Sequence, residues 1–279
     1  MTREIVIQKL FGFILVGAAI AYLTPLQIGL CFSVFGQGHF LGAYYYQWKA
    51  GKMKMKWVIV YAVLTIALFY WAVALHQYAY IALSAAVLFF IHHFQDEVTL
   101  FRKERSLMRT LEQLPPIILF SSLAGDALLR SDFTLAASLF SIAVFILYVI
   151  LSVIRRESPD VLGVYYWLIT AGLLSLFFFH VHPAPETLMG SVVLFHYVCW
   201  YVFFYFRFAS NPAKQLVYIR DMFAVHGVVF GTYVLWIAGP VATQIAFGYI
   251  YLPVYFYIWA ILHILFSVRI ADYKAALRW

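Results

Sequence analysis

Two histidines next to two carboxylates interrupt an apolar stretch of the chain. The segment FFIHHFQDEVTLFRKER carries His92 and Asp96 four residues apart, and His93 and Glu97 at the same spacing. On a helix, residues four apart share one face, so each imidazole has a carboxylate beside it. Imidazole and carboxylate groups bind iron, copper, manganese or zinc, and a carboxylate that does not bind the metal can fix the tautomer of an imidazole that does. The stretch therefore predicts one wall of a metal site, with the carboxylates as ligands or as supports.

Other histidines lie at matching distances from the basic residues that mark helix ends. Four lie 9 to 11 residues from the nearest such charge, roughly 15 Å at 1.5 Å per residue: His39, His92, His93 and His196. Two lie six residues from one, about 9 Å deep: His226 and His263. Ionisable residues inside a membrane are costly and by default mark function. We expect metal ligands at His39, His92, His196 and His263, and a second metal site or supporting hydrogen bonds at His93, Asp96, Glu97 and His226.

Aromatic residues accompany two of these histidines. The stretch FHYVCWYVFFYFR surrounds His196, and GQGHFLGAYYY surrounds His39 with three glycines that let another helix or a substrate approach closely. We expect a pocket for a long apolar molecule lined by Trp200, Tyr197 and Tyr45.

The composition requires these residues to be placed by membrane helices. The chain has 279 residues, of which 65% are hydrophobic and 11% charged, against about a quarter charged in a soluble domain. A spanning helix needs about 20 mostly apolar residues. We predict an all-α, polytopic bundle forming a single transmembrane domain over 1–279. It has about ten spans, at 5–24, 26–47, 57–76, 78–101, 110–130, 134–154, 161–181, 187–207, 222–243 and 246–269.

Basic residues predict the sidedness of these spans. With both termini in the cytoplasm, 18 of the 19 basic residues fall on the cytoplasmic side, and Arg130 is the exception. The net charge of +7 is therefore a membrane signal, and we expect no nucleic-acid partner. We expect an uncleaved first helix and a multi-pass protein of a bacterial inner membrane.

The sequence lacks the motifs of several other cofactors. It has no glycine-rich phosphate loop, GxSxG elbow or dinucleotide fingerprint, so any electron source lies on another protein. Its two cysteines, Cys31 and Cys199, form no CxxC pair. Nitrogen and oxygen ligands without thiolate favour non-haem iron, with copper, manganese or zinc as alternatives.

The order of the histidine blocks resembles that of the Brp/Blh membrane dioxygenases. The matching blocks are GHF at His39, IHHFQDE at His92, LFHYV at His196 and ILHILFSVR at His263. The resemblance spans most of the chain through short motifs. It departs from the family in lacking an early Pro-His-Gly and a second histidine in the third block, and in doubling the histidine of the second block. It implies iron held by histidines on separate helices and oxidative cleavage of a carotenoid; the departures bear on beta-carotene as substrate more than on the metal.

These observations favour a membrane non-haem iron oxygenase acting on a lipophilic substrate, carotenoid-like or another lipid, taken from the bilayer. A dioxygenase draws its electrons from the substrate, which suits a chain with no reductase domain. Three alternatives stay open: a di-metal hydroxylase or desaturase with an external electron donor, a proton- or metal-coupled transporter, and an assembly or scaffold protein. No catalytic residue beyond the ligands is predicted.

Overall fold

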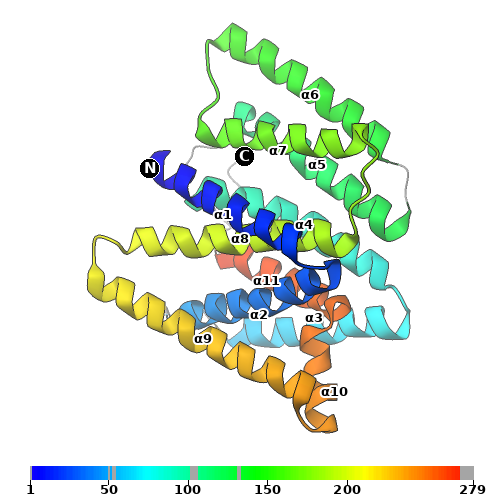
Figure 1. Cartoon of the computed structure of the whole chain (residues 1–279), viewed down its shortest axis with the longest axis vertical. Helices are drawn as coiled ribbons and strands as arrows, with labels where there is room; N and C mark the ends of the chain where they lie inside the picture. Colours follow the sequence, from blue (N-terminus) through cyan, green and yellow to red (C-terminus); the bar gives the residue numbers. More distant parts are fainter. Residues whose placement is uncertain (1, 50, 52–54, 101–105, 131–132, 271–279) are drawn as a thin grey trace.

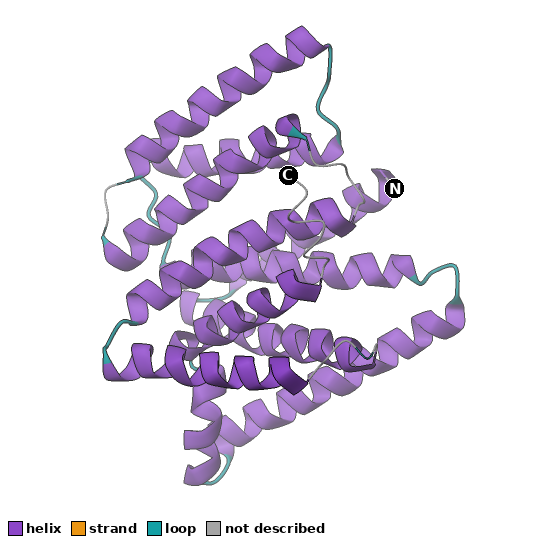
Figure 2. Ribbon diagram, turned by 180° about the vertical axis from the view of Figure 1, so that it is seen from behind, coloured by secondary structure: helices purple, strands orange, loops and turns teal. Residues whose placement is uncertain are grey.

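The computed structural model describes residues 2–49, 51, 55–100, 106–130 and 133–270. In this part of the chain the regular structure is entirely helical (Figure 2), which confirms the all-α prediction. The helices are α1 (Thr2–Tyr22), α2 (Pro25–Lys49), α3 (Met55–Ala74), α4 (Tyr78–Leu100), α5 (Leu107–Leu129), α6 (Thr134–Arg155), α7 (Val161–Phe178), α8 (Pro185–Arg207), α9 (Pro212–Ala238), α10 (Val241–Tyr251) and α11 (Pro253–Ile270).

Several helices begin at residues that satisfy the first backbone amides of a helix. Ser106, Asp160 and Asn211 each accept a hydrogen bond from the amide three residues later, at 3.0 to 3.1 Å, and so cap α5, α7 and α9. Pro185 and Pro212 stand at the first turn of α8 and α9, where a missing N–H costs nothing.

The helices follow the predicted spans through α8; α9 begins ten residues before the window 222–243 and ends within it, and the last window is broken. The window 246–269 covers parts of two helices, α10 and α11, which meet at 54° around Leu252. Pro253 follows the break and cannot donate a backbone hydrogen bond to continue α10.

Seven helices of the described chain are long and apolar enough to cross a membrane, and the bent pair would make an eighth. They make this a multi-pass membrane protein: α1, α3, α4, α6, α7, α8 and α9. About ten spans were predicted. α2 and α5, at 25 and 23 residues, are long enough to cross a membrane, but their polar side chains keep them below the hydropathy of the seven helices. Much of the basic sequence that predicts sidedness lies outside the described residues, at 52–54, 101–105 and 271–279.

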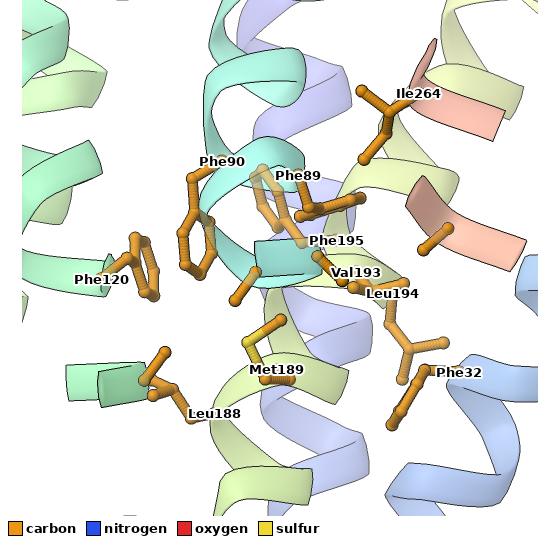
Figure 3. Close-up of a cluster of buried hydrophobic side chains, with 14 of the residues drawn as sticks. Phe32, Phe89, Phe90, Phe120, Leu188, Met189, Val193, Leu194, Phe195 and Ile264 are labelled. Atoms are coloured by element: carbon orange, nitrogen blue, oxygen red, sulfur yellow. The ribbon is translucent and has the colours of Figure 1, made fainter. Parts of the chain in front are cut away.

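The core brings together helices that are distant in the sequence. α8 packs between α1 and α2, and α11 packs against α4 (Figure 1). Figure 3 shows part of this packing, a cluster of buried apolar side chains that includes Phe89 and Phe90 of α4 and Phe195 of α8. The ring of Phe90 stacks on Phe120 of α5, with ring centroids 4.5 Å apart. Side chains from four helices, α2, α4, α8 and α11, meet in this core.

Candidate metal centre

Four buried histidines, one from each of these helices, form a closed ring of imidazoles. They are at most 4% exposed, and we call them the imidazole cluster: His39 of α2, His92 of α4, His196 of α8 and His263 of α11. Going round the ring, adjacent ring centroids are 5.5 Å (His39–His196), 5.7 Å (His196–His92), 5.9 Å (His92–His263) and 5.0 Å (His263–His39) apart. The structure therefore brings together all four predicted ligands.

Each imidazole of the cluster has one buried ring nitrogen that makes no hydrogen bond. These atoms are Nδ1 of His39, Nε2 of His92, Nε2 of His196 and Nδ1 of His263. A buried polar atom left without a hydrogen bond costs roughly 1–3 kcal/mol. The four nitrogens lie on adjacent rings and are candidate metal donors; within the described chain, His92 and His196, together with Asp96, have ligand atoms within 4.8 Å of one another.

Asp96 adds a carboxylate to this donor set. It lies one turn after His92 on α4, and its Oδ2 is 3.2 Å from His92 Nε2. Ligand atoms of His92, Asp96 and His196 all lie within 4.8 Å of one another. Two histidines and one carboxylate with open positions are the ligand set of many non-haem iron(II) oxygenases.

His93 supports the cluster from its edge. Its Nδ1 is 2.9 Å from Nδ1 of His196, so one of the two nitrogens carries the proton. Its Nε2 lies 3.7 Å from Oε1 of Glu97, which as a carboxylate only accepts. We assign the protons to His93 Nε2 and His196 Nδ1, because the reverse would set a bare nitrogen against the carboxylate. This tautomer leaves Nε2 of His196 with a free lone pair, as a metal ligand requires.

Lys9 completes this chain of contacts and was not predicted as part of the site. Its ammonium pairs with Glu97, and the two side chains are 7% and 5% exposed. The ammonium also lies 4.4 Å from the ring centroid of Tyr165. Lys9 is among the basic residues predicted to lie on the cytoplasmic side; the signal that would have found it is its place inside the first apolar window, beside Gln8. Lys9 thus gives the buried Glu97, which lies beside His93, a partner of opposite charge.

His226 lies outside the imidazole cluster. It is half-buried on α9, and its Nδ1 donates to the carbonyl of Met222 at 2.8 Å. Its Nε2 then accepts from the hydroxyl of Tyr201 at 3.0 Å. A Cβ on Gly38 would come within 2.5 Å of this Nε2, so the glycine lets α9 approach α2. Both nitrogens of His226 are therefore occupied, unlike those of the cluster.

The three predicted pocket aromatics separate into two places. Tyr197 stacks on His39 with ring centroids 4.7 Å apart, and Trp200 meets the same imidazole edge-on at 4.8 Å. Tyr45 lies nearer the end of α2, where its ring centroid is 5.4 Å from Lys49 Nζ. Tyr197 and Trp200 thus pack against a cluster ligand, and Tyr45 lies away from it.

Two apolar cavities flank the site. One, of about 590 Å³, lies among α1, α4, α5, α7 and α8, and we call it the α1–α7 cavity. His93, Tyr165 and Ser191 are in its wall. A second, of about 650 Å³, has Tyr201 and His226 in its wall. The first cavity is separated from the imidazole cluster by His93, which contacts His196.

Comparison with known proteins adds no family. No family model, curated protein or solved structure matches the chain. The function is therefore argued from the site itself.

Proposed function

We propose that the protein is an integral-membrane metalloenzyme, a non-haem iron oxygenase that acts on a lipophilic substrate. One observation carries the proposal: four buried imidazoles from four helices each leave a ring nitrogen without a hydrogen bond, within one closed ring. A scaffold protein gains nothing from four such costs in one place. A metal site would account for the four ring nitrogens that lack hydrogen bonds.

The donor chemistry supports iron among the metals. The donors are imidazole nitrogens and the Asp96 carboxylate, which suit non-haem iron, with copper, manganese and zinc also able to bind such a set. The buried Cys199 has its Sγ 4.0 Å from Lys9 Nζ and 3.8 Å from the carbonyl of Gln8, so it is engaged on the far side of Glu97. Bound ferrous iron would supply the capacity to bind and reduce dioxygen.

The protein's own residues have three tasks in this proposal. Glu97, paired with Lys9, lies 3.7 Å from His93 Nε2 and favours a proton on that nitrogen, and His93 in turn fixes the tautomer of His196. Tyr197 and Trp200 pack on His39 and keep water from it. Apolar helices on every side let a lipophilic substrate arrive from the bilayer.

The metal content and an open coordination position test the proposal together. Protein purified without added metal is analysed by mass spectrometry for iron, copper, manganese and zinc. The ferrous form is then treated with nitric oxide and examined by electron paramagnetic resonance. We expect stoichiometric iron and the signal of a high-spin iron–nitrosyl, which requires a position that protein ligands do not fill.

Other results would favour the alternatives. Protein without any stoichiometric metal would overturn the enzyme and leave the transporter or the scaffold. Two metals per chain would favour the hydroxylase or desaturase with an external electron donor. The resemblance to the Brp/Blh dioxygenases stays a prediction, which oxygen uptake with carotenoids and with other lipids in proteoliposomes tests. A bacterial inner membrane as the location also stays a prediction.

A further inference from the structure

The α1–α7 cavity opens toward the bilayer. Phe13 and Ile20 of α1 and Leu168 of α7 are in its wall and are 49%, 50% and 64% exposed on the outside of the protein. Both helices are among those able to cross a membrane, so this outer face meets lipid chains. α1 and α7 lie side by side in Figure 1. A lipophilic molecule can therefore enter between them without crossing water.

The inner end of the cavity is polar. His93, with 2% exposure, and Tyr165, with 5%, stand there, and the Tyr165 hydroxyl is 3.5 Å from His93 Nε2. At about 590 Å³ the cavity falls within the usual range of roughly 300–1,000 Å³ for small-molecule sites. Apolar walls with a few polar groups at one end are typical of such sites.

Ser191 gives the second, independent sign of a ligand. Its hydroxyl is buried and makes no hydrogen bond. Five other helical serines donate to the carbonyl four residues earlier: Ser33, Ser121, Ser138, Ser141 and Ser175. Ser122 and Ser152 also lack a hydrogen bond, but neither is in the wall of this cavity. Ser191 stands in the cavity wall, and rotation about its Cα–Cβ bond can present its hydroxyl to a bound molecule. Such a hydroxyl pairs with an oxygen of the ligand.

The polar end lies beside the metal centre. Ser191 precedes His196 by five residues on α8, about 7.5 Å along the axis. His93 contacts His196 directly. An oxygen atom bound at the polar end would therefore be one imidazole away from a cluster ligand.

We infer that the α1–α7 cavity binds a long-chain lipophile whose head carries a hydroxyl or carbonyl oxygen. The head lies at Ser191, Tyr165 and His93, and the chain extends between α1 and α7 to the bilayer. This names the substrate class of the proposed oxygenase and rests on that function for the reaction, although binding itself does not require the metal.

Two glycines allow the cavity to be filled without a clash. Gly17 and Gly172 are in its wall, and a Cβ at either meets nothing within 4 Å. Gly231 on α9 has the same open surroundings and is not in this wall, so it provides a matched control. Leucine at the first two positions occupies the cavity, and leucine at the third adds the same side chain elsewhere.

The test is equilibrium binding of tritiated hexadecanol to full-length protein in detergent, with tritiated hexadecane as the probe without an oxygen. We expect saturable hexadecanol binding that Gly17→Leu and Gly172→Leu each reduce at least tenfold, and that Gly231→Leu leaves unchanged. Ser191→Ala should weaken hexadecanol binding about fivefold, the effect of one hydrogen bond, and leave hexadecane binding unchanged.

The two proposals fail in different ways. Hexadecanol binding that the leucine variants do not reduce, or that equals hexadecane binding in the unsubstituted protein, overturns the cavity assignment whatever the metal content. Binding with the expected variant pattern in protein that holds no metal supports the cavity and overturns the oxygenase. Metal per chain is therefore measured in every variant, and we expect it to be equal in all of them.

Discussion

Two buried polar clusters in this protein differ in how their polar atoms are satisfied. The ionic cluster joins α5, α6 and α7: Arg109 lies 2.6 Å from Glu112 and 2.9 Å from Asp160, and Tyr148 donates to Glu112 at 3.0 Å. Its ionised groups face opposite charges, and Asp160 also caps α7. In the imidazole cluster, the unbonded nitrogen of His92 faces the Asp96 carboxylate, but those of His39, His196 and His263 have neither a hydrogen bond nor a salt bridge within the described chain.

The difference separates polar groups that build the fold from those that serve a ligand. A buried charge with its partner is already compensated, so it fixes the packing of its helices. A buried lone pair without a partner is a cost that a bound ion repays. We therefore assign the ionic cluster to stability and the imidazole cluster to metal binding, and four variants test that division.

The largest effect is expected from removing two imidazoles of the cluster. The double variant His92→Ala and His196→Ala should reduce bound metal from stoichiometric to background, because it deletes two of the four lone pairs. Elemental analysis of purified protein measures this. His182→Ala is the control, since that side chain is 73% exposed near Asp126. An unchanged metal content in the double variant would show that the imidazole cluster does not bind the metal.

Breaking the ionic cluster should act on stability alone. Glu112→Gln leaves Arg109 with Asp160 as its carboxylate partner, so the cost should lie at or below the lower end of the roughly 3–5 kcal/mol for a buried ion pair that is broken completely. We expect a clear fall in the melting temperature of the detergent-solubilised protein, measured by intrinsic fluorescence. Metal per chain should stay the same. A Glu112→Gln protein that unfolds normally but loses metal would reverse the two assignments.

The support around His196 should show an intermediate effect. His93→Phe keeps the ring volume but removes the acceptor for His196 Nδ1–H. Loss of such an outer hydrogen bond typically weakens metal affinity about 10–100-fold. Competition with a chromogenic iron chelator measures the affinity. His93→Gln, which can still accept a hydrogen bond, should retain more affinity than His93→Phe; equal affinities would show that His93 acts only by filling space.

The smallest effect is expected at His226. Tyr201→Phe removes one hydrogen bond to an imidazole whose other nitrogen stays paired, and should cost about 1 kcal/mol. Chelator competition should give the same metal affinity as the unsubstituted protein, and a melting curve should show the small loss of stability. A drop in metal affinity would move His226 into the metal site.

The sequence predicted the helices and the depth of the histidines better than their direction. Counting residues from basic charges places six histidines in the same layers, and five of them meet in or beside the imidazole cluster. His226 has a comparable depth, but its helix turns it toward Tyr201. Rotation of a helix about its axis depends on packing against its neighbours, which residue spacing does not encode.

Lys9 and the broken last span show a second limit of pattern reading. The sequence does not show whether a lysine near a chain terminus faces water or a buried carboxylate. Glu97, the partner of Lys9, is 88 residues away. Pro253 was visible in the sequence, but proline is tolerated within spanning helices when neighbours supply the missing hydrogen bonds. Only the packing of α10 and α11 decides that the chain bends there.

The placement of the four proposed ligands along the chain has a consequence for how the protein is made. His39 lies in α2 and His263 in α11, the last helix of the described chain, so the proposed donor set is complete only when α11 has packed against α2 and α4. Metal capture would thus follow insertion of the whole chain. A ligand that binds only the finished fold stabilises it by mass action. The cell could then distinguish a correctly assembled molecule from an incomplete one by whether it retains its ion.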